Sequence, residues 1–135
     1  MPVERDEMAT LLSLEDIVRV RQKIRAIAAE IGFGLVDQTK IITAASELAR
    51  NTVQHGGGGD VRLQILREGG RHGLKLVFED RGPGIPDVEQ AMKDGYTTAD
   101  GLGLGLGGAR RLSHEFELSS RLGEGTRVVI IWWRS

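Results

Sequence analysis

The chain has 135 residues, of which 40% are apolar and 27% charged, and its formal net charge is −1. This composition predicts one folded domain with a single core, and the near-neutral charge provides no overall basic field for nucleic acid or an anionic membrane. Because the sequence has no cysteine, disulfides, thiolate metal sites and a cysteine nucleophile are excluded.

The N-terminal part of the sequence predicts a short strand followed by two helices. Its acidic start, MPVERDEMATLL, is unlike a signal peptide, and we expect Met8–Leu12 to form an edge strand. Ser13, with Asp16 three residues later, resembles a capping box and opens a helix that ends at GFG. Apolar residues recur in this helix at steps of three and four: Ile17, Val20, Ile24, Ile27 and Ile31. Asp37 is expected to cap a second helix, which runs to the four glycines at 56–59.

The second half of the sequence predicts four strands. Apolar and polar residues alternate around 61–65 and 74–78, with REGGRHG as the turn between them. DRGPGIPD ends the second of these strands, and Val88–Lys93 is predicted as a short helix. GARRLSHEF predicts a further helix of about two turns, and strands around 116–119 and 127–133 complete the chain. Helices and hairpin-joined strands are segregated along the sequence, which favours an α+β two-layer sandwich over a doubly wound sheet.

The last strand contains VVIIWW, which is apolar on both faces. We expect Trp132 or Trp133 to pack against a helix, the alternative being that it covers a partner protein. The run is far shorter than the ~18 apolar residues that span a bilayer. Together with the absence of a signal peptide, this predicts a cytoplasmic protein.

The stretch DGLGLGLGGARRL is the most unusual part of the sequence, with five glycines among positions 101–108. Gly103, Gly105 and Gly108 match the spacing G-x-G-x-x-G of dinucleotide-binding proteins, but that fingerprint requires a preceding strand, and KDGYTTAD is polar and turn-like. P-loop and eukaryotic-type kinase motifs are absent. Two interpretations remain: a loop without function, or exposed N–H groups at a helix start that bind an anion.

The segment SELARNTVQHG carries groups suited to phosphate chemistry. Glu47, Asn51 and His55 follow one another at four-residue spacing, roughly on one helix face. The Asn51 amide oxygen is a suitable ligand for Mg²⁺, and the Glu47 carboxylate could accept a proton from an attacking hydroxyl or water. The alternative is a solvated face on which Glu47 pairs with Arg50. His55 by itself is best interpreted as a helix-end capping residue.

The segment FEDRGPGIP ends a predicted strand with Asp80, which Gly82 and Gly84 follow. A buried carboxylate beside glycine-rich backbone can accept a hydrogen bond from an exocyclic amine such as that of adenine. An ordinary Asp-Gly turn is the alternative interpretation.

Taken jointly, ELARN, DRGPG, GLGLGL and GEGT resemble the N, G1, G2 and terminal threonine elements of the GHKL ATPase superfamily, in the same order and at similar separations. This superfamily includes gyrase B, MutL and the ATP domains of histidine kinases. The resemblance covers essentially the whole chain, so it implies a single GHKL-type domain over residues 1–135. It also implies the Bergerat fold, a mixed and mostly antiparallel sheet with helices on one face, which agrees with the predicted sandwich.

The resemblance implies ATP and Mg²⁺ as cofactors and assigns roles to individual residues. Asn51 would hold Mg²⁺, and Glu47 would activate the acceptor. Asp80 would recognise adenine, with Thr126 beside it. Glycines would let the base approach and would form the phosphate-binding end of a lid whose mobile part is Tyr96–Asp100. The cofactor-binding residues besides Asn51, Asp80 and Thr126 are Gly82, Gly84, Gly101, Gly103, Gly105 and Leu106.

Within the superfamily, GFGLVDQTKIITAASELARN, EDRGPGIPD and LSHEFELSSRLGEGT are most similar to the RsbT-type switch kinases. These small bacterial proteins phosphorylate Ser or Thr on STAS-domain partners in stress-signalling assemblies and then bind a PP2C-type phosphatase regulator. The resemblance therefore implies a protein kinase with these partners and without nucleic acid or membrane partners. An anti-sigma factor with the same chemistry and a non-catalytic ATP-binding module are the alternatives, and the presence of Glu47 and Asn51 argues against the second.

Overall fold

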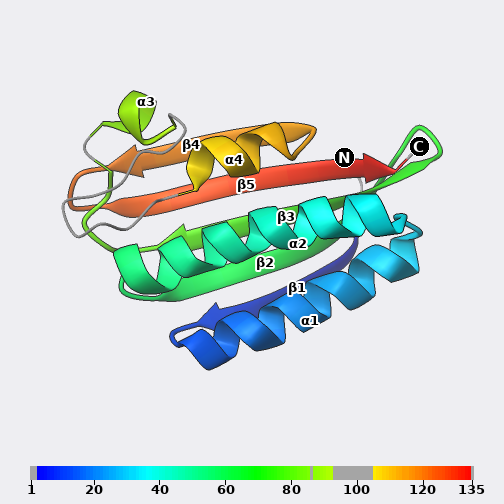
Figure 1. Cartoon of the computed structure of the whole chain (residues 1–135), viewed down its shortest axis with the longest axis horizontal. Helices are drawn as coiled ribbons and strands as arrows, with labels where there is room; N and C mark the ends of the chain where they lie inside the picture. Colours follow the sequence, from blue (N-terminus) through cyan, green and yellow to red (C-terminus); the bar gives the residue numbers. More distant parts are fainter. Residues whose placement is uncertain (1–2, 86, 93–104, 135) are drawn as a thin grey trace.

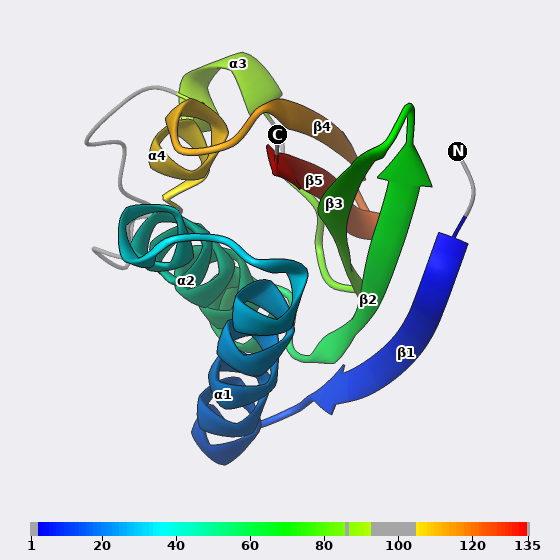
Figure 2. The ribbon, with the colours of Figure 1, turned by 90° about the vertical axis from the view of Figure 1, so that its right-hand side faces the viewer.

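A five-stranded sheet with helices on one face forms the protein (Figures 1 and 2). The computed structural model describes residues 3–85, 87–92 and 105–134. The strands are β1 (Val3–Leu11), β2 (Gly59–Glu68), β3 (Arg71–Asp80), β4 (Glu115–Arg121) and β5 (Gly125–Arg134). The helices are α1 (Leu14–Ile31), α2 (Leu35–Arg50), the π-helical turn η1 (Asn51–His55), α3 (Val88–Ala91) and α4 (Leu106–Arg111).

The strand order is β1-β2-β3-β5-β4, and neighbouring strands are antiparallel in all four pairings that the structure describes. The predicted α+β two-layer sandwich is thus confirmed, with a described sheet that is antiparallel throughout. Figure 2 shows α1, α2 and α4 on the same side of the sheet. The core lies between these two layers, where alternate strand residues such as Leu76, Phe78 and Ile130 are almost fully buried. Each such side chain stabilises the fold by roughly 1.5–3 kcal/mol.

Helix α1 forms as the sequence predicts. The Ser13 side chain accepts a hydrogen bond from the backbone N–H of Asp16 (3.3 Å) at the N-terminus. Ile17, Val20 and Ile24 are buried against the sheet, as their spacing requires. The helix ends at Gly32, which adopts the left-handed conformation (φ 107°) that glycine tolerates best.

Two predicted helix boundaries are wrong. Helix α2 begins at Leu35 with Gly34 as its N-cap, so Asp37 is exposed in the first turn and caps nothing. The Gln38 side chain donates to the Phe33 carbonyl (2.8 Å). This bond fixes the short connection between α1 and α2, and the helix begins two residues before Asp37.

The predicted helix GARRLSHEF is also displaced, because α4 spans Leu106–Arg111 and Glu115 already belongs to β4. Sheet formation explains the early end of this helix. The His114 N–H donates to the Ile131 carbonyl on β5 (3.1 Å), which draws the chain into the sheet. Pairing also lengthens the predicted strands: β1 starts at Val3, and the turn between β2 and β3 shrinks to Gly69 and Gly70.

The two tryptophans of β5 point to opposite faces of the sheet. Trp132 is buried in the main core, and its indole N–H donates to the Leu112 carbonyl (2.9 Å), which confirms the predicted packing on the helical side. Trp133 belongs to a smaller cluster with Leu66 and Ile131, and the Arg71 guanidinium lies 4.1 Å from its ring centroid. Within the described residues, no helix is long and apolar enough to cross a membrane.

Candidate functional site

The end of α2 places Glu47 and Asn51 one helical turn apart. Beyond Arg50 the helix widens into η1, where the Gly56 N–H donates to the Asn51 carbonyl five residues earlier (2.9 Å). Single π-helical turns of this kind occur frequently at functional sites. The wider turn also changes the direction of His55 from that of a regular helix. Its Nε2 lies 3.3 Å from the Gly84 carbonyl oxygen, so His55 donates across to the loop after β3 when Nε2 is protonated.

The Glu47 carboxylate lies between an arginine and the start of α4. Arg50 Nη1 donates to Glu47 Oε1 (2.8 Å), so the ion pair that belonged to the alternative interpretation of this segment is present. A Cβ atom placed on Gly105, which has φ +65°, would lie 2.5 Å from Glu47 Oε2. Only glycine therefore fits here without a shift, and it lets α4 begin against the carboxylate. Because the Glu47 side chain is 36% exposed, it can also be reached by an incoming group.

Asp80 ends β3 in a confined position. Its Oδ1 accepts a hydrogen bond from the Gly82 N–H (2.9 Å). Burial raises the pKa of the Asp80 carboxyl above its ordinary value, although the N–H groups of Gly82 and Thr126 and the nearby His55 act in the opposite direction. A Cβ atom on Gly56 would lie 2.3 Å from the Asp80 Cγ, so the loop after η1 needs glycine to admit this side chain.

Backbone packing explains why glycine occupies positions 82 and 84. Gly84 has φ +78°, and a Cβ atom there would lie 2.2 Å from the Arg121 carbonyl oxygen. A Cβ atom on Gly82 would lie 2.6 Å from the Gly56 carbonyl oxygen. Both glycines therefore let backbone segments approach one another closely. Their contact with a base stays a prediction.

Thr126 faces Asp80 across the β3–β5 pairing. Its hydroxyl lies 2.8 Å from the Ser120 hydroxyl, which accepts a hydrogen bond from the Ile85 N–H (2.8 Å). These bonds join the loop after β3 to the β4–β5 hairpin. They hold one wall of a small pocket.

This pocket brings together four of the residues predicted to bind nucleotide: Asn51, Asp80, Leu106 and Thr126. It is lined further by Leu48, Thr52, His55, Phe78, Ile85 and Val128. Its free volume is only about 10 Å³, the room of about one water molecule. A purine base therefore needs side chains such as Leu106 or Ile85 to move aside. Glu47, Gly82, Gly84 and Gly105 are not among its lining residues, and Gly101, Gly103 and Tyr96–Asp100 lie outside the described residues.

Sequence reasoning missed three lining residues with distinct roles. Thr52 is buried, and its hydroxyl donates to the Leu48 carbonyl (3.0 Å). The sequence predicts His55 as a helix-end capping residue, whereas in the structure it contacts the carbonyl of Gly84 in the loop after β3. Ile85 closes the pocket from that loop. The spacing of His55, four residues after Asn51, is the sequence signal that could have assigned His55 to this pocket.

A larger cavity of about 820 Å³ lies on the other side of Asp80 and Thr126. The start of β2 with the two residues before it (57–60), the end of β3 (79–81) and the β4–β5 hairpin line it, together with Leu12 and Val88. Asn51 and Leu106, which line the smaller pocket, are absent from the lining of this cavity. We therefore place the candidate site at the smaller pocket, which Asn51 and Leu106 line together with Asp80 and Thr126.

The donor set of the smaller pocket fits a magnesium ion that arrives with a nucleotide. In the described part of the chain, no three His, Asp or Glu side chains gather as a metal cluster. Mg²⁺ bound to nucleotide phosphates needs few protein ligands and prefers oxygen. The half-buried Asn51 amide, on the turn after Glu47, is an oxygen ligand of that kind.

The family model of the histidine kinase-, DNA gyrase B- and HSP90-like ATPases matches residues 36–135. The chain is 50% identical over 118 residues to the serine/threonine-protein kinase RsbT of Bacillus subtilis (strain 168), covering 87% of this chain and 89% of that protein. It is 30% identical over 132 residues to an anti-sigma F factor of Anoxybacillus flavithermus, with coverage of 93% and 88%.

Solved structures support the same fold at low sequence identity. The catalytic domain of the histidine kinase ThkA superposes with a TM-score of 0.55 at 15% identity, covering 98% of this chain and 95% of that one. The SiaB–SiaC complex of Pseudomonas aeruginosa gives a TM-score of 0.52 at 14% identity, with coverage of 98% and 91%.

Proposed function

Because the chain belongs to the family of histidine kinase-, DNA gyrase B- and HSP90-like ATPases, we propose that it is a serine/threonine-protein kinase that uses Mg·ATP. One observation carries this proposal: Glu47 and Asn51 lie one turn apart beside a pocket that contains Asp80. The identity of 50% with the kinase RsbT supports the same chemistry. We assign the activity to a single domain formed by residues 1–135.

In this proposal the pocket residues bind and orient the nucleotide. The Asp80 Oδ2 accepts a hydrogen bond from the adenine amine, while its Oδ1 stays bonded to the Gly82 N–H. Gly84 and Thr126 shape the surroundings of the base. The Asn51 amide oxygen coordinates Mg²⁺, which supplies positive charge against the phosphate oxygens.

The lid residues bind the phosphates in the same proposal. Gly101, Gly103 and Gly105 offer unhindered backbone N–H groups, and Leu106 closes over the base. Gly105 is the described member of this set that lies against Glu47. The contact between Gly105 and Glu47 places the end of the lid beside the proposed proton acceptor.

Phosphoryl transfer then needs one proton acceptor. The acceptor hydroxyl oxygen forms a bond to the γ-phosphorus, the bond from that phosphorus to the β–γ bridging oxygen breaks, and ADP leaves. Glu47 accepts the hydroxyl proton as the oxygen becomes a phosphoester. Arg50 holds one carboxylate oxygen of Glu47, which leaves Oε2 for this role.

We propose a STAS-domain protein of a bacterial stress-signalling assembly as the phosphoacceptor, with a PP2C-type phosphatase regulator as a second partner, all in the cytoplasm. A sigma-factor-binding role is the alternative, because the chain is 30% identical to an anti-sigma F factor. The 50% identity to RsbT over a similar share of the chain favours the switch kinase.

The test replaces the proposed base. Glu47→Ala should bind Mg·ATP within a few-fold of the wild type, because general-base assistance acts mainly in the transition state. Phosphoryl transfer to a purified STAS-domain protein of the same organism should fall by roughly 10²–10⁴-fold. The lower end is expected if the transition state is loose. Radiolabelled transfer and nucleotide titration measure the two quantities.

Arg50→Ala is the matched control, because it removes the ion-pair partner and keeps the carboxylate. Its transfer rate should change much less. Full transfer by Glu47→Ala would remove Glu47 from the role of base. Wild-type protein that phosphorylates no STAS-domain protein of the organism, but binds a sigma factor tightly, would favour the anti-sigma role.

A further inference from the structure

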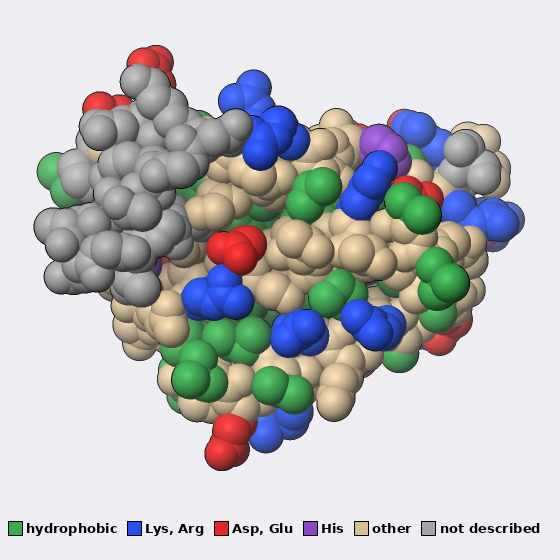
Figure 3. Space-filling model, in the orientation of Figure 1, with side chains coloured by type: hydrophobic (Ala, Val, Ile, Leu, Met, Phe, Trp, Pro, Cys, Tyr) green, Lys and Arg blue, Asp and Glu red, His purple; other side chains and the backbone are tan. Residues whose placement is uncertain are grey.

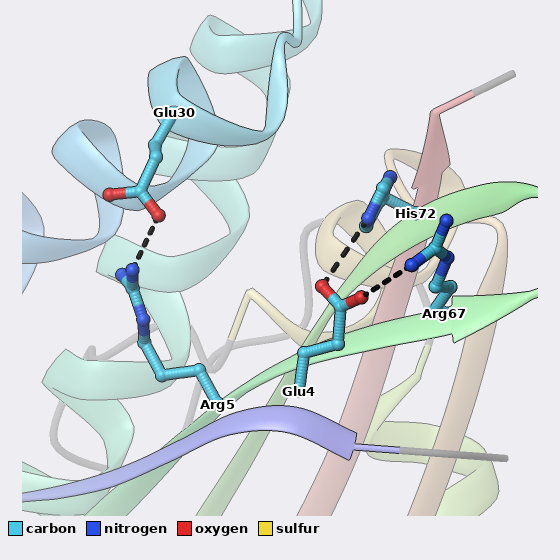
Figure 4. A network of polar contacts seen from close by, with 5 residues as sticks. All are labelled: Glu4, Arg5, Glu30, Arg67 and His72. Carbon is cyan, nitrogen blue, oxygen red and sulfur yellow. Dashed lines mark hydrogen bonds and ion pairs between the residues drawn. The ribbon is translucent and has the colours of Figure 1, made fainter.

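Over the described ranges of the chain, charged side chains along the β1 flank form ion pairs, whereas several cations on the outer faces of the helices do not. Along β1 the cations and anions form ion pairs, which Figure 4 shows in part. Arg5 pairs with Glu30 on α1 (2.5 Å), and Glu4 contacts Arg67 (3.4 Å) and His72 (3.3 Å). Two further pairs join β1 to its neighbours: Lys23 with Glu7 and Arg62 with Asp6, both at 2.8 Å.

The outer faces of the helices differ from this flank. Arg21 and Arg25 on α1, Lys40 on α2 and Arg110 on α4 are all exposed. Within the described residues, none of these four side chains has a carboxylate at ion-pair distance. Figure 3 shows basic side chains across this side of the molecule with few acidic ones among them. We call Arg21, Arg25, Lys40 and Arg110 the basic helical face.

The cations of the basic helical face lie on α2, the helix that carries Glu47, and on α1 and α4, which both contact α2. Lys40 and Glu47 are seven residues apart on α2, so they lie on the same side of that helix. Arg21 and Arg25 are one turn apart on α1, which packs beside α2 (Figures 1 and 2). Arg110 lies on α4, whose N-cap meets the Glu47 carboxylate. A protein that brings a hydroxyl to Glu47 therefore approaches over these cations.

We propose that the basic helical face binds an acidic surface of the phosphoacceptor protein, a proposal that rests on the proposed kinase function. The whole chain has a formal net charge of −1, so these cations are a local concentration and do not follow from a basic composition. Unpaired like charges on one face repel one another, and an anionic partner removes that repulsion. Complementary charge at an interface raises the association rate and fixes orientation. The acceptor thus carries Asp and Glu around its Ser or Thr.

The test reverses the charge of two arginines on α1, neither of which belongs to the proposed nucleotide or catalytic residues. Arg21→Glu and Arg25→Glu should each raise the KM for the STAS-domain acceptor several-fold, and the double variant by about tenfold or more. The kcat and the Kd of Mg·ATP should stay within twofold of the wild type. Added salt should raise the wild-type KM and affect the double variant much less, because screening acts on exposed charges.

Lys75→Glu is the matched control. It makes the same change of charge as each single variant, but it lies on β3 on the face of the sheet away from the helices. Its KM should match that of the wild type. If the doubly reversed variant does not fold, as circular dichroism would show, Arg21→Ala/Arg25→Ala takes its place, with a smaller rise in KM.

Three results overturn the inference. The KM of the charge variants could stay within twofold of the wild type, Lys75→Glu could raise it equally, or the Kd of Mg·ATP could weaken in parallel. The last result would assign the cations to the nucleotide phosphates. These outcomes are distinct from failure of the proposed function, in which the wild-type protein itself transfers no phosphoryl group to a STAS-domain acceptor.

Discussion

At the scale of single residues, Asp80 is held in a confined position by neighbouring glycines. Gly56 and Gly82 have no side chains because the Asp80 carboxylate and the neighbouring backbone fill that space. Burial raises the pKa of Asp80, as expected for a carboxylate that leaves bulk water. Such a group is costly unless it forms hydrogen bonds, and it receives one from the Gly82 N–H. The Thr126 N–H also acts on this carboxylate. In the proposed function, the Asp80 Oδ2 accepts a further hydrogen bond from the base.

Asp80→Asn tests whether this oxygen recognises adenine. The Asn amide oxygen can keep the bond to the Gly82 N–H, but its NH₂ group then faces the adenine amine, donor against donor. Calorimetry should show weaker Mg·ATP binding with the fold retained. Glu79→Gln, the same chemical change on the exposed neighbouring residue, should bind normally. Normal binding by Asp80→Asn, or equal competition by GTP in the wild type, would contradict the assignment.

At the scale of elements, the start of α1 shows how local sequence stabilises a helix. The Asp16 carboxylate accepts a hydrogen bond from the Leu12 N–H (2.9 Å) and pairs with Arg19. The Leu12 bond, followed by the Arg19 bond, lowers the pKa of Asp16. A lowered pKa in the folded state means that the ionised form stabilises the fold. This contribution is complete above the ordinary aspartate pKa of about 3.9 and is lost as pH falls through the lowered value.

Asp16→Asn should therefore lower the melting temperature at pH 7. The difference from the wild type should begin to shrink as pH falls below about 3.9, and it should be lost once the pH is below the lowered folded-state pKa of Asp16, where the wild-type carboxyl itself is neutral. Thermal melts across pH 2.5–7, taken in roughly half-unit steps, measure it. Glu15→Gln is the control, since it removes an exposed charge from the same first turn. A Tm difference that is constant with pH would show that the Asp16 charge is not responsible.

At the scale of the whole molecule, the proposed nucleotide pocket lies where separate elements meet. Side chains from α2, η1, β3, α4 and β5 line it, and it is nearly filled in this structure. Binding thus has to rearrange contacts between the helical layer and the sheet. A ligand that binds only the folded form stabilises all of these elements together.

Mg·ATP at 100 times its Kd should raise the free energy of unfolding by about 2.7 kcal/mol, which appears as a Tm higher by several degrees. Asn51→Ala leaves phosphate charge uncompensated, so its Kd should weaken at least tenfold, about 1.4 kcal/mol. The same nucleotide concentration then stabilises it correspondingly less. Gln54→Ala, an exposed amide on the same turn, should behave as the wild type. Equal Tm increases in Asn51→Ala and wild type would remove Asn51 from magnesium binding.

The sequence by itself determined the layer architecture and the chemistry of the site. Apolar spacing in α1 and alternation in β2 and β3 follow from short-range geometry, which a sequence displays directly. The residues that supply oxygen ligands and a proton acceptor, Asn51, Asp80 and Glu47, are equally visible because their chemistry belongs to the side chain. Their assignment to a nucleotide stays a prediction from resemblance.

Only the tertiary structure decided where elements end and which groups meet. Sheet pairing ended α4 at Arg111 and extended β1, since hydrogen bonds between distant strands outweigh local helix preference. The π-helical turn at Asn51–His55 places His55 beside the loop of Gly84, and no local sequence pattern predicts such a turn. The pairing of charges was decided in the same way. Arg5 finds Glu30 twenty-five residues away, whereas Arg21 and Arg25 find no carboxylate among the described residues, because ion pairs depend on which surfaces the fold brings together.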